Sequence, residues 1–451
     1  MKISGLALSS YSTTLLQGLS TTEVNSLSSK ELSGLLTSQI NSLSTDQIQA
    51  ISASAIVGLS AISSLDAEKI FALVTAQIAA LGTGQVGGMS TAQIAALTTN
   101  QIGKLTAAQV VSLSTAQVAA IETQDLAKMT TSQISAMETI DLASLSSAQI
   151  KALTTDQING LTSLQVKELT TAQLVALTTD QASKLSTAMV SALTSAQIAA
   201  VAVDDFAVLS TGAIANLTTA QVNALTTAQV EGLSTTQAAA LTTAQVKALT
   251  TAQVAKLETA DLAKLGTGHI QALSTAAIAN LTAAQFTSMG TDQINALSSS
   301  QVKALTTAQL VALTTDQASK LSTAMVSALT SAQIAAVAVD DFAVLSTGAI
   351  AGLTTAQVKA LTTAQVEGLS TTQAAALTTD QVSVLTTAQV AKLETADLAK
   401  LGTGHIQAMS TAAIANLTTA QISSMSTSQI TALTTAQISA LSTAQISAIQ
   451  V

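Results

Sequence analysis

Large apolar side chains recur in this sequence with a period of eight residues. From Leu65 onward the chain runs in about 48 uninterrupted octads with the consensus Leu-Thr-Thr-Ala-Gln-Val-x-Ala. Leucine at position 1 and valine or isoleucine at position 6 are the large apolar residues of each octad. Looser octads precede Leu59, and the segment 59–64 is two residues short. Because terminal repeats are usually atypical, we predict divergent capping repeats over 1–64 and one continuous array over 65–451.

The octad fits neither a continuous helix nor a flat strand. In a helix, eight residues advance by about 800°, so the apolar stripe would drift by about 80° per repeat. In a strand, positions 1 and 6 have opposite parity and would point to opposite faces of the sheet. A β-coil would need a turn in every octad, yet no position is consistently Gly, Asn or Asp. A β-solenoid that displays rows of threonine is kept as the alternative fold.

One short helix in each octad agrees with the residues in detail. Threonine at position 2 and glutamine at position 5 form a capping box, in which each side chain binds the backbone N–H of the other residue. The apolar residues at positions 1 and 6 then form a hydrophobic staple around the cap. One octad shows all four roles, with Leu241 and Val246 as the staple and Thr242 and Gln245 as the capping box.

The charged residues support the same placement of helices. Acids fall where helices should begin: Asp46, Glu122, Asp156, Asp180, Glu258, Asp316, Asp380 and Glu394. Lysines fall where they should end: Lys104, Lys128, Lys184, Lys247, Lys256, Lys264, Lys359 and Lys400. The helix macrodipole favours this order of charges. Glu168, Glu231 and Glu367 depart from it, so the order is a bias.

No octad can be stable alone. Ordering eight residues costs on the order of 8–16 kcal/mol of backbone entropy. Burying one leucine and one valine returns roughly 3–6 kcal/mol, and a cap adds about 1 kcal/mol. Each octad must therefore stack on its neighbours, as repeats do in a solenoid. We predict an all-α solenoid or superhelix of short capped helices, with Leu, Val or Ile, and Ala inward and Thr, Ser and position 7 outward.

A longer duplication is superimposed on the octads. The segment 169–280 recurs almost verbatim as 305–416, and the two copies are offset by 17 octads. Because 17 is odd, we interpret single octads, and not pairs of octads, as the interchangeable unit.

Composition limits the classes of function. The net charge is −9 and only 9% of residues are charged, without the clustered Lys and Arg that nucleic-acid binding needs. With no cysteine, the chain requires neither a reducing nor an oxidising compartment. No apolar stretch is long enough for a transmembrane helix. The opening segment, MKISGLAL, makes a poor signal peptide, so export would use a route without a recognisable cleavable signal.

Few residues have the chemistry of a site. His269 and His405 occupy position 5, where we expect a structural role, because two residues so far apart in the array are not expected to converge. Two doublets, 204–205 and 340–341, could bind a cation weakly, but acids at a helix N-terminus are the simpler interpretation. Three Gly-x-Gly pairs lack the third glycine of a dinucleotide site and are interpreted as relaxing a turn: Gly82/Gly84, Gly266/Gly268 and Gly402/Gly404. We expect no catalytic, cofactor or metal site, and not an enzyme.

Two resemblances follow from the octad. Its Leu-Thr-x-x-Gln-Val opening looks like the start of the first helix in TAL-effector repeats, but those repeats are about four times longer and read bases with residues that have no counterpart here. The array resembles octapeptide tracts of large bacterial secreted and surface proteins, which implies a structural role outside the cell. We therefore expect an extracellular or cell-surface protein that self-associates into a fibre, sheath or matrix. The alternatives are a monomeric surface spacer or adhesin stalk and a threonine-rich ice- or surface-binding solenoid.

Overall fold

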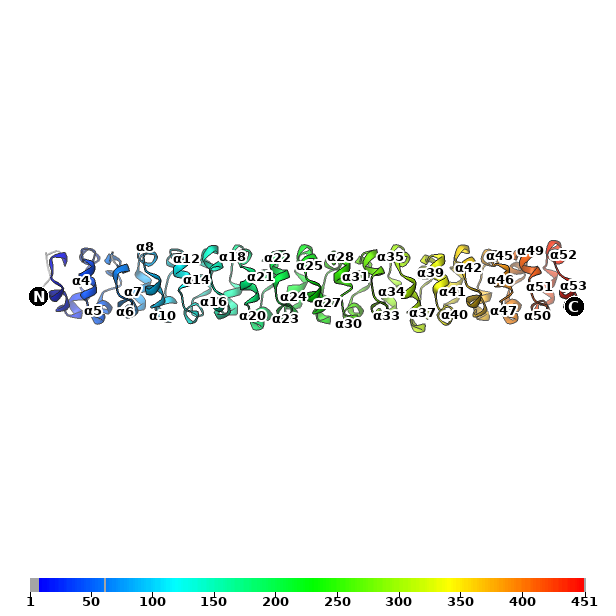
Figure 1. Ribbon diagram of the computed structural model, residues 1–451, viewed down its shortest axis with the longest axis horizontal. Coiled ribbons are helices and arrows are strands. Elements are labelled where there is room, and N and C mark those ends of the chain that lie inside the picture. Colours follow the sequence, from blue (N-terminus) through cyan, green and yellow to red (C-terminus); the bar gives the residue numbers. More distant parts are fainter. Residues whose placement is uncertain (1–7, 61, 450–451) are drawn as a thin grey trace. The chain divides into compact units, whose positions relative to one another are not determined.

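The computed structural model describes residues 8–60 and 62–449. These residues form 53 α-helices of four to six residues and three 3-10 helices, and no strand occurs among them. The predicted all-α solenoid of short helices is confirmed and the β-solenoid alternative is wrong. The chain divides into two compact units, Met1–Leu225 and Thr226–Val451. Within each unit the short helices follow one another turn by turn (Figure 1).

Every octad places its helix in the same frame. From α6 (Ala67–Ala72) to α53 (Thr443–Ser447), each α-helix begins at position 3 and ends at position 6, 7 or 8. Before α28 (Thr243–Ala248), the N-cap Thr242 is extended, with φ −79° and ψ 159°; after it, Leu249 is extended again, with φ −62° and ψ 134°. Because ψ near 140° lies outside the helical region, each octad consists of a short helix and an extended corner.

Successive turns of each unit are joined by contacts between residues that lie several octads apart in sequence. Most helices pack on the helix three further along the chain, as α22 (Ser195–Ala200) does on α25 (Thr219–Ala224). The Nε2 of Gln221 donates to the carbonyl oxygens of Val190 at 3.0 Å and Leu193 at 2.7 Å, which precede it by 31 and 28 residues. One turn thus takes between three and four octads, so the beginning of one helix faces the end of a helix in the preceding turn.

The core of each unit consists of positions 1, 5 and 6. In the octad 241–248, Leu241 is 3% exposed and Val246 is fully buried. Positions 2, 3, 4 and 7 of this octad are exposed, and position 8 is half-buried. Leucine and valine therefore point inward as predicted. The prediction was wrong for alanine, which is exposed at position 4 and half-buried at position 8, and it did not include the buried glutamine at position 5.

The irregular N-terminal octads contain both α-helices and 3-10 helices. The two short 3-10 helices η2 (Ile56–Gly58) and η3 (Ile62–Ser64) lie at the phase slip. A Cβ on Gly58 would collide with the backbone carbonyl of Ser29, so only glycine fits this close approach. Within residues 8–60, five α-helices precede them: α1 (Thr13–Gln17), α2 (Thr21–Asn25), α3 (Ser29–Leu32), α4 (Thr37–Ser42) and α5 (Thr45–Ala50). That residues 1–64 act as a cap stays a prediction.

Candidate functional site

The capping box has the same geometry in octad after octad. The Oγ1 of Thr242 accepts a hydrogen bond from the backbone N–H of Gln245 at 3.2 Å. In return, the Oε1 of Gln245 accepts from the backbone N–H of Thr242 at 2.7 Å. Leu241 and Val246, on either side of the box, are both buried. Two of the N–H groups that a helix start leaves unpaired are thus satisfied within each octad.

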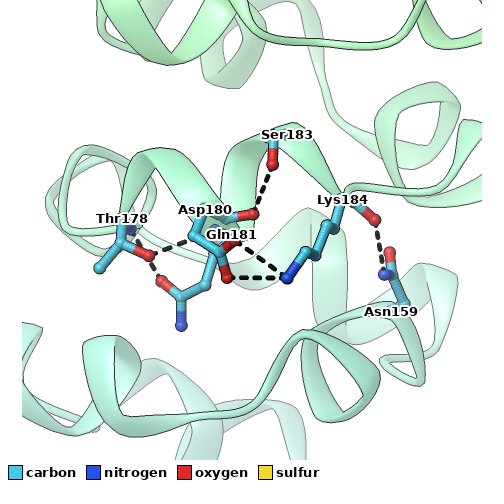
Figure 2. Close-up of polar contacts among 6 residues, drawn as sticks. All are labelled: Asn159, Thr178, Asp180, Gln181, Ser183 and Lys184. Carbon is cyan, nitrogen blue, oxygen red and sulfur yellow. Dashed lines mark hydrogen bonds and ion pairs between the residues drawn. The ribbon is translucent and has the colours of Figure 1, made fainter.

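Charged side chains reinforce some of these helices from the surface. Figure 2 shows α20 (Thr179–Ser183), in which Asp180 in the first turn pairs with Lys184 across 2.9 Å. The Ser183 hydroxyl donates to the carbonyl oxygen of Asp180 at 2.8 Å. Both charged side chains are more than half exposed, so the ion pair contributes at most a few tenths of a kcal/mol. The observed pair follows the order of charges that the helix dipole favours.

The side-chain amide nitrogen of the position-5 glutamine makes a second set of hydrogen bonds, which the sequence analysis missed. In α42 (Thr355–Ala360), the Nε2 of Gln357 donates to the carbonyl oxygens of Val326 at 2.9 Å and Leu329 at 2.8 Å. These carbonyls lie at the C-terminal end of a helix in the preceding turn, where backbone acceptors are short of donors. The Val326 carbonyl also accepts from the Leu329 N–H at 3.2 Å, so the glutamine adds a second bond there. We call the position-5 glutamines that bridge turns in this way the glutamine ladder.

The sequence held a signal for this ladder. Glutamate and glutamine serve equally well in a capping box, and Glu23 and Glu31 do so in the N-terminal octads. From Leu65 onward, however, position 5 is never glutamate. A carboxylate can accept from the cap but cannot donate to the preceding turn, which explains the preference for the amide.

Methionine at position 5 is accompanied by an asparagine that supplies the missing acceptor for the cap N–H. At Met325 the N-cap Ser322 donates its backbone N–H to the Oδ1 of Asn295 at 2.8 Å. The Nδ2 of Asn295 donates to the carbonyl oxygen of Lys320 at 2.9 Å. Unit 1 repeats this arrangement around Met189 with Asn159, Lys184 and Ser186, and Figure 2 shows its Asn159–Lys184 bond. Position 7, expected to be merely a surface position, can therefore join two turns.

The two histidines act within their own octads. The Nδ1 of His269 accepts from the backbone N–H of Gly266 at 3.0 Å, and His405 does the same with Gly402 at 3.0 Å. Each imidazole therefore takes over the acceptor role of glutamine, which requires the neutral ring with its proton on Nε2. The backbone of Gly266, with φ −72° and ψ 163°, matches that of the threonine caps, so conformation does not require this glycine.

Aspartate at position 5 leaves a buried carboxylate in place of the ladder amide. Asp261 and Asp397 are 0% and 1% exposed, and neither oxygen of either side chain has a hydrogen-bond partner among the described residues. Burial, with a further contribution from the charge of Glu258, raises the pKa of Asp261 to about 6, and the backbone N–H of Glu258 partly opposes this rise. Burial and the charge of Glu394 likewise raise the pKa of Asp397 to about 6. These two carboxyl groups destabilise unit 2 when they are ionised.

We expect Asp261→Gln to stabilise its neighbourhood at pH 7 and to remove part of the pH dependence there. The pKa is higher in the folded than in the unfolded chain, so the folded state binds more protons between about pH 4 and 6 and stability falls as pH rises through this window. At pH 7 the ionised group costs up to about 3 kcal/mol. Amide hydrogen exchange at pH 4 and 7, corrected for its intrinsic pH dependence, should show the gain in protection shrinking at pH 4.

The exposed Asp380 provides the matched control for this change. Asp380→Gln removes an acid from the first turn of α45 (Thr379–Ser383) and should cost a few tenths of a kcal/mol. A gain from Asp261→Gln that is the same at pH 4 as at pH 7 would show that the buried charge is not its source.

The structure separates the residues of each aspartate doublet. Asp204 is exposed, whereas Asp205 is 7% exposed and accepts from the Thr179 hydroxyl at 2.9 Å. The second doublet is divided in the same way, with Asp341 4% exposed. No group of three acidic, histidine or cysteine side chains suited to a metal ion occurs in the part of the chain that the structure describes. The doublets are not paired carboxylates on one surface, because their second members belong to the buried position-5 set.

These features define an all-α solenoid repeat protein in which one octad is the repeating unit. The chain matches the ALTTAQ repeat in nine segments that together cover more than half of it: 78–115, 134–171, 199–235, 230–259, 254–291, 286–323, 338–371, 359–394 and 390–427. The chain belongs to the ALTTAQ repeat family. No curated protein matches it.

The described helices have a further property in common. None of the helices within residues 8–60 and 62–449 is both long and apolar enough to cross a membrane. Residues 1–7, which hold most of the segment considered as a signal peptide, lie outside the described part of the chain.

Proposed function

We propose that this chain is a non-enzymatic, extracellular or cell-surface structural protein that self-associates laterally into a fibre, sheath or matrix. The observation that carries the proposal is the uniformity of the exposed surface. In consensus octads such as 241–248, the exposed residues at positions 2 to 4 are Thr, Thr and Ala. Each turn of between three and four octads presents this small, uncharged surface again, so one lateral contact can recur along a unit.

Repetition converts weak contacts into a stable association. A single patch of threonine and alanine side chains contributes little, but linked contacts act at high effective concentration and their energies combine. With 9% charged residues, little electrostatic repulsion opposes the approach of two copies. The location outside the cell is supported by the resemblance of the octads to tracts in secreted and surface proteins.

The buried polar groups support a structural role over a catalytic one. Gln357 and its equivalents use both ends of the amide to join backbone groups, and the two histidines accept cap N–H groups. A catalytic nucleophile needs an adjacent base held in place. The imidazoles, the natural candidates for such a base, are instead engaged at Nδ1 by the backbone.

Sedimentation velocity and electron microscopy over a wide concentration range test the assembly. We expect concentration-dependent growth into long particles with lateral contacts. A chain that remains monomeric at every concentration would overturn the proposal and favour the spacer or stalk.

A charged variant provides the matched control for assembly. Ala356, Ala364 and Ala388 are exposed at position 4 of their octads, the position that Asp380 occupies naturally. Changing all three to aspartate suits the first helical turn and places like charges close together on one side of the coil, over two successive turns. This variant should fold and assemble at higher concentrations than the unmodified chain. Equal assembly of both would show that this side of the position-4 surface is not the contact.

A further inference from the structure

Unit 1 contains a groove that differs from the uniform surface elsewhere. It has a volume of about 490 Å³ and lies between α6 (Ala67–Ala72), α9 (Thr91–Ala95) and the beginnings of α10 (Thr99–Ile102) and α13 (Thr123–Leu126). This volume falls in the range of small-molecule sites, about 300–1,000 Å³. Phe71 lines the groove and is 62% exposed. The other three phenylalanines of the chain are fully buried, so an aromatic ring open to solvent is exceptional here.

Three carboxyl groups line the same groove. They belong to Glu68, Glu122 and Asp125, and no described residue of the lining is a lysine, arginine or histidine. The side chain of Gln124 donates to the Oε2 of Glu122 at 2.7 Å and restrains this carboxylate at the groove. Among the described residues, these acids do not form a cluster that suits a metal ion. The groove is therefore negative over an extended area, which suits a cation with a carbon skeleton.

Asp125 provides the observation that points to a ligand. It occupies position 5, is 2% exposed, and its Oδ1 has no hydrogen-bond partner within the described part of the chain. Burial raises the pKa of this carboxyl group, a hydrogen bond from Thr99 opposes the rise, and the charge of Glu122 adds to it. A buried acceptor without a donor is costly, by about 1–3 kcal/mol in general. Asp261 and Asp397 also have oxygens that are unpaired among the described residues, but only Asp125 of these three aspartates lines this groove.

We propose that the groove binds an organic cation, an alkylammonium or guanidinium group on a short carbon chain. The N–H groups of the cation donate to the Glu122 carboxylate and, after a rotation of the Asp125 side chain that opens Oδ1 to the groove, to Asp125, forming charge-assisted hydrogen bonds. The carbon chain lies against the ring of Phe71, whose face also attracts a positive charge. Glu68 adds attraction at the side where α6 borders the groove. The site lies within unit 1, and its occupancy does not depend on self-association.

The exposed ring supplies the probe for a test. In the full chain with ¹³C-labelled phenylalanine, Phe71→Leu identifies the Phe71 signals by their loss. Titration with n-butylguanidinium or n-butylammonium at low salt should shift these signals saturably, with Kd on the order of 1 mM for ligands of this size. The neutral n-butanol carries the same carbon chain and should cause at most a weak, unsaturated shift. No saturable shift with either cation, or an equal response to butanol, would overturn the proposal.

Two substitutions locate the binding. Asp125→Gln restores the family consensus at position 5 and should weaken binding of n-butylguanidinium at least tenfold. Asp141→Gln is the matched control, since Asp141 is an equally buried position-5 aspartate that does not line the groove. Its Oδ1 already accepts from the Thr115 hydroxyl at 2.7 Å. Binding should be unchanged in this variant. Equal affinity in Asp125→Gln and the unmodified chain would contradict the proposed site.

Discussion

Leu249→Asp should unfold the turns around residue 249, whereas Ala255→Asp should leave them folded. Leu249 is 7% exposed at position 1, and Ala255 is exposed at position 7. Aspartate at the first site would bring a charge into an apolar core, at a cost of several kcal/mol. In a solenoid each repeat relies on its neighbours, so this local cost should spread to the adjoining turns.

Amide hydrogen exchange measured peptide by peptide checks this prediction, because it resolves local stability along a chain that need not unfold in one step. Protection should be lost over the octads around Leu249→Asp and kept in Ala255→Asp. Similar losses at both sites would mean that the inward and outward positions are wrongly assigned.

Gln357→Met should destabilise the two turns that Gln357 joins almost as strongly as Leu249→Asp destabilises its own turns. The change removes the acceptor for the Thr354 N–H and the amide that donates to the carbonyls of Val326 and Leu329, of which, among the described residues, only the Val326 carbonyl keeps a bond, from the Leu329 N–H. Each unsatisfied buried backbone group costs about 1–3 kcal/mol, and partial access of water to these groups keeps the total on the order of 3 kcal/mol. Methionine keeps the volume of the side chain nearly unchanged, so the loss reports mainly on hydrogen bonds.

A second substitution should restore part of this stability. Asn295 lies at position 7 of an octad in the turn before Met325 and supplies the acceptor that methionine lacks. Ser327 has the same place in the sequence relative to Gln357, at position 7 of its own octad. Ser327→Asn combined with Gln357→Met should therefore regain about 1 kcal/mol through a restored cap hydrogen bond. Urea unfolding and hydrogen exchange of the two single variants and the double variant measure the recovery. Additive effects, without recovery, would contradict the proposed exchange of roles.

The sequence predicted the features that depend on neighbouring residues. Thr242, Gln245 and their equivalents lie three positions apart, so a capping box is readable from one octad. The length of the turn depends on residues 25 to 31 positions apart and is not encoded in any single octad. The two copies of the duplication are offset by 17 octads, an odd number. This offset agrees with a turn of between three and four octads, because such a turn is not a whole number of octads and the single octad is the only unit that repeats.

The buried aspartates were missed for a related reason. An acid near a helix start is ordinarily stabilising, so nothing local distinguishes the buried Asp261 from the exposed Asp380. The difference is the preceding turn: the position-5 side chain faces backbone carbonyls there, and the position-4 side chain faces solvent. Only the stacking of turns leaves an oxygen of Asp125 unpaired and brings Asp125 into the lining of the same groove as Phe71.

The most direct test of the solenoid is a pair of engineered cysteines, which the chain allows because it has none of its own. The Glu367 carboxylate and the Lys392 ammonium lie 3.2 Å apart, although the two residues belong to successive turns. Glu367→Cys with Lys392→Cys should be joined rapidly by a short bis-maleimide reagent, because the two native side chains together span the gap between these positions. Glu367→Cys with Val384→Cys should not, although Val384 is nearer to Glu367 in sequence, because it lies only about half a turn further along the coil. Rapid closure of the second pair, or failure of the first in a folded chain, would contradict a turn of between three and four octads.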